Sequence, residues 1–523
     1  MRRISVAGLA LAILLVLAPT ATASPLLTLR ADGSSFARED RYLPAPQAAP
    51  GARANARRAA TGARANARRA ATAASTLSAR AAADRPRRTV RRELRRMLKA
   101  DAIDRSTYDA HRATYADARR LRRKLSGARR SALDAVLDNL ENVAARGDLT
   151  VSRLPALFET VARNREWWSN GPLLSYGQRV SFSGSPLVWQ YYTGEGLQIQ
   201  WLGTFGKANA LWKSGKHDSE LGELLDAATE LAARRAGGIA FEYLFDFDGG
   251  RPPWVSGLAQ ATGVQALSRA AVRLNEPRYF EAARAGLGIF RTAPPTGVRV
   301  KTSRGAHYLI YSFAPRLRVL NAFTQAVNGL HDFAILAKDA PGAALYAAGE
   351  AQLRSELPRY DTGAWSRYSL HREADLGYHK LARDFLRNLC TRLRKDEARR
   401  RSERVPDPAR YCSAAKRFSG YLKEDPVISL VSRRARAGRP ASLKLKLSKP
   451  AFVKLAVKRG ERTLTVLSAR LGSGRSSLRW NRPRRPGSGY EVMLRATDLA
   501  GNVGSSSGEL KVLKERRKRK RRR

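Results

Sequence analysis

The chain has 523 residues, enough for about three to four domains of roughly 150 residues each. Its hydrophobic content of 43% allows a sizeable core and so excludes an entirely disordered chain. The 97 Lys and Arg residues against 45 Asp and Glu give a formal charge of +52, which favours anionic partners such as polysaccharides, nucleic acid or membrane surfaces. Alanine and arginine dominate nearly every segment, so a GC-rich coding bias is an alternative origin of the basicity.

The first residues have the pattern of a secretory signal. Two arginines follow Met1, an apolar run extends from Ile4 to Leu17, and Ala21-Thr22-Ala23 precedes Ser24 as a cleavage site. We therefore expect a signal peptide over residues 1–23 and a secreted or cell-surface protein. An uncleaved anchor is the alternative, although the run is shorter than the roughly 18 residues of a membrane span.

Residues 24–84 are rich in alanine and arginine. They contain GARANARRAAT twice in succession, at Gly51–Thr61 and Gly62–Thr72, and lack the aromatic and branched residues of a core. This composition predicts a disordered linker.

Residues 85–168 form a basic region in which apolar side chains recur at helical spacing, as in Val90, Leu94 and Met97. The pattern predicts two or three amphipathic helices. Their apolar faces either pack on the next domain, which is the commoner case, or lie on an anionic surface.

Residues 169–203 favour strands, because Val180, Phe182, Val188 and Trp189 are separated by Gly-rich turns, and they predict a small β segment. The pattern is helical again over residues 204–420. The expected helices, separated by Gly and Pro breaks, are Leu221–Arg235, Val255–Leu274, Arg278–Thr292, Leu320–Ala337, Ala343–Leu357 and Tyr378–Leu393. Repeated helix pairs with long polar loops predict a mainly α protein built on an α/α toroid, in which loops at one end line a cleft.

Residues 426–513 alternate polar and apolar side chains, as in Ser442–Leu447, and predict a β-sandwich. The segment YEVMLRATDLAGNVGSSSGELKV resembles the last strands of bacterial immunoglobulin-like modules, so an Ig-like fold is expected. The basic residues 514–523 are expected to be a disordered tail, with contact to an anionic cell-wall polymer as its expected role.

Only two cysteines, Cys390 and Cys412, are present. In an oxidising exterior they are expected to form one disulfide at the end of the helical domain, with two buried thiols as the alternative.

The segment Leu357–Lys380 places Tyr360, Tyr368 and Tyr378 near His371, Arg372 and His379. Phenols have a pKa of about 10 in solution and act as acids or bases near neutral pH only if neighbouring cations lower that pKa. The sequence therefore predicts chemistry at this segment. Tyr360 with Asp361 is more typical of a turn and helix cap.

The region from Trp254 to Leu389 resembles the C-terminal helical domain of the D-glucuronyl C5-epimerases, which invert C5 of glucuronic acid residues in a polysaccharide. The matching segments, in order along the chain, are WVSGLAQATGVQALSRA, VLNAF, GLHDF, LPRYDTG, RYSL and YH. This resemblance implies a base that removes the proton α to a carboxylate, an acid that returns a proton to the opposite face, and cationic or hydrogen-bonding groups on the carboxylate.

The resemblance also implies the site residues. Tyr311, Tyr368 and Tyr378 match family tyrosines and are expected to be catalytic. Trp254 is expected to stack on a sugar ring, with core packing as the alternative. The residues expected to bind substrate are Trp254, His307, His371, Arg372 and His379.

The chain departs from the family pattern at two positions that bear on activity. Ile310 stands where the family has a glutamate associated with catalysis, and His371 stands where it has an arginine that binds carboxylate, with Arg372 next to it. His307, with an unperturbed pKa near about 6.5, is a possible substitute base.

Three functions follow from these residues. The first is an isomerase that epimerises a uronic acid in an anionic, glycosaminoglycan-like polysaccharide such as a relative of heparan sulfate; the others are a non-catalytic glycan-binding surface protein and a uronan lyase. The carboxylates Glu242, Asp246 and Asp248 suggest a glycoside hydrolase or a cation site as further alternatives. No motif indicates a cofactor or a metal site, and the absence of a reader motif argues against nucleic acid. The oligomeric state is not indicated.

Overall fold

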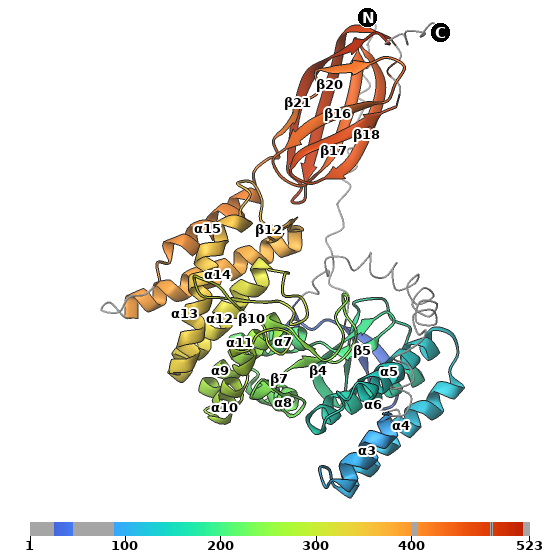
Figure 1. Cartoon of the computed structure of the whole chain (residues 1–523), viewed down its shortest axis with the longest axis vertical. Coiled ribbons are helices and arrows are strands. Elements are labelled where there is room, and N and C mark those ends of the chain that lie inside the picture. Colours follow the sequence, from blue (N-terminus) through green and yellow to red (C-terminus); the bar gives the residue numbers. More distant parts are fainter. Residues whose placement is uncertain (1–25, 45–87, 400–405, 482, 484, 516–523) are drawn as a thin grey trace, which may run out of the picture.

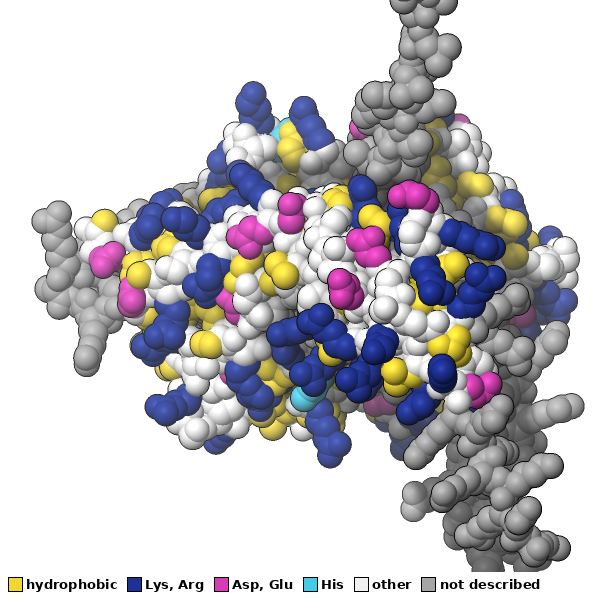
Figure 2. Space-filling view, turned by 90° about the horizontal axis from the view of Figure 1, so that it is seen from above, with side chains coloured by type: hydrophobic (Ala, Val, Ile, Leu, Met, Phe, Trp, Pro, Cys, Tyr) yellow, Lys and Arg dark blue, Asp and Glu magenta, His cyan; other side chains and the backbone are white. Residues whose placement is uncertain are grey.

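The computed structural model describes residues 26–44, 88–399, 406–481, 483 and 485–515. The predicted signal peptide, most of the predicted linker and residues 516–523 of the predicted tail lie outside this part. A β domain forms one end of the molecule, helices fill the middle, and a small sheet with the first helices forms the other end (Figure 1). Seen from the β-domain end, Lys and Arg side chains cover far more of the surface than Asp and Glu do (Figure 2).

The N-terminal sheet has five strands in the order β2-β1-β3-β4-β5. Its strands are β1 (Leu26–Leu29), β2 (Ser35–Arg38), β3 (Arg179–Phe182), β4 (Ser185–Tyr192) and β5 (Gly196–Ile199). Strand β1 runs parallel to β3, and the hydroxyls of Thr28 and Ser181 are 2.8 Å apart across that pair. The prediction of a linker from residue 24 is therefore wrong for residues 26–44. The apolar LLTL segment buries Leu29, and only the repeat that follows has the composition of a linker.

The basic region contains four α-helices, one more than predicted. They are α3 (Val90–Lys99), α4 (Arg105–Lys124), α5 (Gly127–Ala145) and α6 (Leu154–Asn170), with the 3-10 turn η1 (Val151–Arg153) before α6. Side-chain caps begin the first two helices, since Thr89 accepts from the Arg92 amide and Asp104 from the Thr107 amide. Their apolar faces share one core with the sheet and the later helices, so these helices pack on the next domain rather than on an external surface.

The middle of the chain is built from helix pairs joined by short hairpins. The helices are α7 (Trp201–Ser214), α8 (Asp218–Glu230), α9 (Gly257–Arg273), α10 (Arg278–Ala285), α11 (Gly288–Arg291), α12 (Leu320–Ala337), α13 (Ala340–Glu356), η2 (Leu357–Tyr360), α14 (Leu376–Arg399) and α15 (Ala409–Tyr421). The hairpins are β6 (Ala233–Arg235) with β7 (Gly238–Ala240), β8 (Glu242–Tyr243) with β9 (Trp254–Val255), β10 (Arg299–Lys301) with β11 (Ala306–Tyr308), and β12 (Arg367–Ser369) with β13 (Arg372–Glu373).

Helices α7, α9, α12 and α14 pack side by side in chain order and form an arc. Helices α8, α10, α13 and α15 pack on the arc mainly against α7, α9, α12 and α14, respectively. Helices α9 and α12 approach closely at Gly329, where a Cβ would lie 2.3 Å from the carbonyl oxygen of Ala261. The mainly helical architecture is thus present, but the closed α/α toroid is not confirmed.

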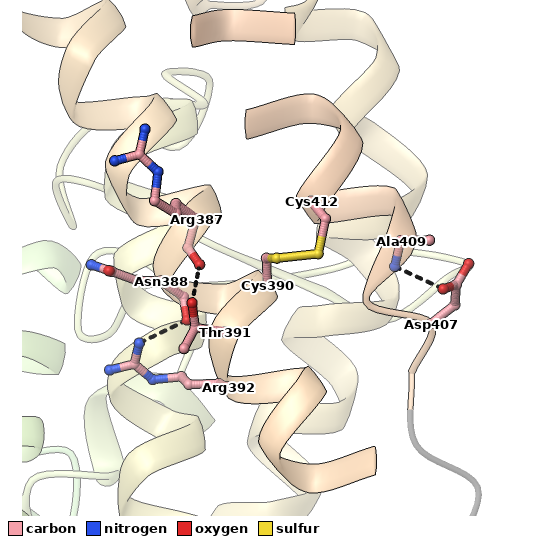
Figure 3. The surroundings of a disulfide bond; sticks show 8 residues. All are labelled: Arg387, Asn388, Cys390, Thr391, Arg392, Asp407, Ala409 and Cys412. Carbon is pink, nitrogen blue, oxygen red and sulfur yellow. Dashed lines mark hydrogen bonds between the residues drawn. A yellow bond between two sulfur atoms is a disulfide. The ribbon is translucent and has the colours of Figure 1, made fainter. Parts of the chain in front are cut away.

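The predicted disulfide between Cys390 and Cys412 is confirmed. It joins α14 to α15, with the two Cα atoms 5.0 Å apart (Figure 3). It restrains α14 on the side opposite Asn388 and Arg392, which both line the cavity described below.

The C-terminal β domain has two sheets around its own core. The three-stranded sheet contains β14 (Ile428–Leu430), β16 (Ala441–Leu447) and β19 (Gly474–Trp480); the five-stranded sheet contains β15 (Arg434–Arg436), β17 (Ala451–Arg459), β18 (Arg462–Leu471), β20 (Gly487–Asp498) and β21 (Val503–Leu513). The predicted alternation holds in β16, where Leu443, Leu445 and Leu447 are buried between exposed neighbours. That this domain is Ig-like stays a prediction.

Candidate functional site

A cavity of about 1570 Å³ lies between the four helices of the arc and the N-terminal sheet. The four helices contribute residues at helical spacing along their length, as in Leu258, Thr262, Gln265 and Arg269 of α9. The sheet side contributes Tyr176, Gln178, Arg179 and Tyr192, which form the wall opposite the helices. The volume exceeds the roughly 300–1,000 Å³ of a typical small-molecule pocket.

The three tyrosines predicted to be catalytic lie together at one end of this cavity. Tyr311 and Tyr378 line it, and the ring of Tyr368 packs on Tyr378 with centroids 4.7 Å apart. The three share a small apolar cluster with Leu258 and Ile310. We call Tyr311, Tyr368 and Tyr378 the tyrosine cluster. Ile310, at the position of the family glutamate, also lines the cavity.

The acidity predicted for these phenols is wrong. Burial raises the pKa of Tyr311, Tyr368 and Tyr378 well above 10, and interactions among the three hydroxyls raise the pKa of Tyr311 and Tyr378 further. Arg372, whose guanidinium lies 6.0 Å from the Tyr368 ring, lowers that pKa only in part. The phenols therefore keep their protons at neutral pH and can donate hydrogen bonds or protons.

Two histidines predicted to bind substrate are enclosed instead. His307 is 0% exposed, and its Nδ1 lies 2.9 Å from Glu356 Oε2. His379 is also 0% exposed; its Nε2 donates to the Phe418 carbonyl at 2.8 Å, so Nδ1 accepts from Ser366 Oγ at 2.7 Å. Neither side chain lines the cavity, and both predictions are wrong. The family's Y-H pair places only its tyrosine in the site.

His379 gives the protein a testable pH dependence. Burial lowers its pKa from 6.5 to about 4, so the unfolded chain binds this proton more tightly than the folded chain does. The stability that the neutral imidazole contributes is complete above pH 6.5 and is lost as the pH falls from 6.5 through 4. We expect a loss of about 3 kcal/mol from this group, measured by urea unfolding between pH 7 and 4. His379→Gln should remove this part of the pH dependence.

The other predicted binding residues are divided between the surface and the cavity wall. His371 and Arg372 are exposed at the β12–β13 hairpin and do not line the cavity, so their contact with substrate stays a prediction. Trp254 lines the cavity, stacks on Tyr243 with centroids 4.3 Å apart, and donates its indole N–H to the Phe245 carbonyl. Its contacts are those of core packing, and stacking on a sugar ring stays a prediction.

Arg179 was not found by sequence reasoning. It lines the cavity, is 9% exposed, and donates from Nη1 to the Pro44 carbonyl, while its Nε has no hydrogen-bond partner. Among the described residues no carboxylate forms an ion pair with it, and burial lowers its pKa. A buried arginine without an internal carboxylate is suited to bind the carboxylate of a ligand. On strand β3 it has no local motif that would distinguish it.

The three carboxylates considered for hydrolysis have different surroundings. Glu242 is buried between Arg153 at 2.6 Å and Arg235 at 2.7 Å, so its role is structural. Asp246 does not line the cavity. Asp248 does not line the cavity either, but it follows Phe247, whose ring centroid lies 5.7 Å from that of Tyr311. Its charge is one of the causes, after burial, that raise the pKa of Tyr176, Tyr311 and Tyr368. Asp248 has a left-handed φ of 48° beside Gly249.

Among the residues that the structure describes, no group of three or more His, Cys, Asp or Glu side chains is arranged to hold a metal ion. No helix in this part of the chain has the length and apolar character needed to cross a bilayer.

Comparison with known proteins identifies the helical segment. Residues 236–404 match the family described as D-glucuronyl C5-epimerase C-terminus. This segment belongs to that family. The D-glucuronyl C5-epimerase of Caenorhabditis elegans is 32% identical over 136 residues, which are 24% of this chain and 22% of that protein. The chain thus matches about a fifth of the relative's length.

Solved structures give weaker likenesses to this chain. An unsaturated glucuronyl hydrolase from Bacillus sp. GL1 aligns with 16% identity and a TM-score of 0.31, covering 43% of this chain and 61% of that one. A sugar epimerase from a ruminal bacterium aligns with 12% identity and a TM-score of 0.30, covering 43% and 62%. These TM-scores carry no argument about function.

Proposed function

We propose that this protein is an exported enzyme that inverts C5 of uronic acid residues in an anionic polysaccharide. The observation that carries the proposal is one cavity that combines the tyrosine cluster with Arg179, a buried cation that lacks a carboxylate partner among the described residues. Membership of residues 236–404 in the C5-epimerase family supports the same chemistry.

The reaction needs a cation, a base and an acid. In the proposed mechanism the carboxylate of the sugar lies on Arg179, which stabilises the negative charge that develops when the C5–H bond breaks. A base takes this proton, the electron pair moves toward the carboxylate, and an acid then delivers a proton to the opposite face of C5. The buried phenols hold their protons and are therefore suited to act as the acid.

Asp248 is our proposal for the base. Ile310 cannot accept a proton, and His307 is enclosed away from the cavity. Asp248 is exposed and is not part of the cavity lining, but it follows Phe247, which lines the cavity with its ring centroid 5.7 Å from that of Tyr311. We expect Asp248→Asn to lose exchange at C5 while uronate binding persists.

The export of the protein and its partners belong to this proposal. The leader pattern of residues 1–23 supports a secreted or cell-surface protein, and the excess of Lys and Arg on the surface supports attraction to an anionic polymer.

The deciding experiment is deuterium exchange. The full chain is incubated in D₂O with glucuronate-containing and iduronate-containing polysaccharides, and deuterium at C5 is measured by NMR and mass spectrometry. Deuterium uptake with inversion supports the proposal. An unsaturated product that absorbs in the ultraviolet would identify a lyase instead, and binding without exchange would identify a glycan-binding protein.

Arg179→Met should lower kcat/KM for C5 inversion by about 100-fold, the size expected for loss of one oxyanion-stabilising donor. Arg179→Lys should recover part of the activity because it restores the charge but not the planar fork. Arg129→Met is the matched control, since Arg129 also donates to a backbone carbonyl, that of Trp168, but lies outside the cavity lining. Equal losses in the two Met variants would remove Arg179 from the carboxylate site.

The second candidate is a non-catalytic module that binds anionic glycans. Ile310 favours it, because this side chain fills the position of the family glutamate inside the cavity and supplies no carboxylate. The two candidates differ in one result only, which is whether hydrogen at C5 exchanges.

A further inference from the structure

The cavity continues from the tyrosine cluster along the helices of the arc, toward their opposite ends. Its lining extends from Leu258 to Arg269 on α9 and from Tyr378 to Arg392 on α14. At a rise of 1.5 Å per residue, these positions are separated by about 17 and 21 Å along the helices. The proposed reaction uses only the first end.

A charged group of side chains lies at the second end. We call Arg269, His331, Asp332, Arg392, Lys395 and Asp396 the far-end cluster; all six line the cavity. Asp332 is its centre: it accepts from Arg392 Nε at 2.6 Å and Nη2 at 2.8 Å, and from Arg269 Nε at 3.1 Å. His331 lies between the two carboxylates, with Nε2 2.6 Å from Asp396 and Nδ1 3.2 Å from Asp332.

The cations of this cluster outnumber its anions. Arg269, Arg392 and Lys395 oppose Asp332 and Asp396, and hydrogen bonds to both carboxylates raise the pKa of His331 although burial opposes this. Each guanidinium has five N–H donors, more than Asp332 can accept. Arg269 is held in place by stacking on Trp212, with its Cζ 4.4 Å from the ring centroid, and by a bond to Asn209 at 2.6 Å.

We propose that the far-end cluster is a second anionic subsite, which binds a carboxylate or sulfate on another sugar of the same glycan chain. This inference rests on the proposed function, because the tyrosine cluster must hold one uronate while the far-end cluster holds a group several sugars away. The cavity is larger than a single-sugar pocket requires. The fixed guanidiniums of Arg269 and Arg392 suit a planar or tetrahedral oxyanion.

The test is the dependence of affinity on chain length. Uronate oligosaccharides of two, four, six and eight sugars, each in sulfated and unsulfated form, are titrated calorimetrically into the full chain at fixed low salt. Wild-type affinity should rise at least tenfold at the length that first reaches the far-end cluster. A larger rise for the sulfated series identifies sulfate as the preferred group, and equal rises identify carboxylate.

Two variants connect this rise to the cluster. Arg269→Met keeps an unbranched chain over Trp212 and leaves Arg392 on Asp332, and Lys395→Gln changes an exposed side chain that needs no repacking. Each should reduce the affinity of long oligomers toward that of short ones. Lys216→Gln, an exposed lysine outside the lining, is the control for loss of one charge.

The possible failures are distinguishable. Binding of short oligomers with no gain at greater length, or a gain that persists in both variants, would overturn this inference and leave the proposed function intact. Failure of every oligomer to bind the wild-type protein would overturn both.

Discussion

Tyr378→Phe is expected to lower the rate of C5 inversion by about 100-fold or more, within the range of about 10²–10⁴ for loss of a general acid or base. Burial keeps the phenol protonated, and its ring lies at the tyrosine end of the cavity. The substitution removes the hydroxyl and preserves the ring that packs on Tyr368. KM should therefore change little, while kcat falls. Inversion is measured by NMR on defined oligosaccharides.

The same variant tests whether different groups serve the two faces of the sugar. If Tyr378 serves one face of C5 and another group serves the other, one epimer should still exchange its C5 hydrogen in D₂O although inversion is lost. Tyr191→Phe is the matched control, because Tyr191 is partly buried and its pKa is also raised by burial, but it does not line the cavity. Unchanged inversion in Tyr378→Phe would exclude this hydroxyl from catalysis.

The grouping of the three tyrosines was predictable, because the segments that contain them resemble segments of a known family and occur in the same order along the chain. Their acidity was not, because a pKa depends on burial as well as on charged neighbours. Arg372 follows Tyr368 closely in the chain, yet the phenol is buried and the guanidinium is exposed. The desolvation of the phenoxide therefore outweighs the cation, and the direction of the shift is reversed.

Adjacent residues can also have unrelated roles. Tyr378 and His379 are neighbours, but on a helix consecutive side chains point about 100° apart. Tyr378 meets the cavity, while His379 joins α14 to Trp365 and to the Phe418 carbonyl of α15. A sequence motif cannot show which of two adjacent residues faces a cavity.

Helices and strands with a long hydrophobic period could be predicted from the sequence. Leu320–Ala337 was predicted with the bounds that α12 has, and the alternation of Ser442–Leu447 lies within β16. Strand β1 and helices α7 and α15 were missed. Strand β1 has four residues and pairs with β3, about 150 residues later in the chain, so its partner is not visible locally.

Arg179 and Asp248 depend even more on the tertiary structure. Strand β3 of the N-terminal sheet places Arg179 in the cavity wall, and the Pro44 carbonyl holds it from a segment that was predicted to be disordered. Asp248 lies in the loop between β8 and β9, next to Phe247 of the cavity lining. Neither residue type is unusual in its local sequence, so only the fold identifies them.

Asp332→Asn is expected to lower the free energy of unfolding by about 3–5 kcal/mol, because removing one partner of a buried ion pair leaves the others uncompensated. Asp332 is buried with Arg269, Arg392 and His331 around it, and the bonds to Arg392 and His331 hold its pKa well below its usual value despite burial. Because the folded pKa is depressed, this stability is present above the unfolded pKa of about 3.8 and is lost only in stronger acid. The difference between variant and wild type, measured by urea unfolding, should thus shrink below pH 4; it should also shrink above pH 6.5, where His331, whose pKa Asp332 helps to raise, loses its proton. Asp226→Asn is the control: it removes a pair with Arg278 whose carboxylate side chain is 37% exposed, and should cost no more than about 1 kcal/mol. Similar losses in both variants would show that the charges around Asp332 are compensated by solvent rather than by each other.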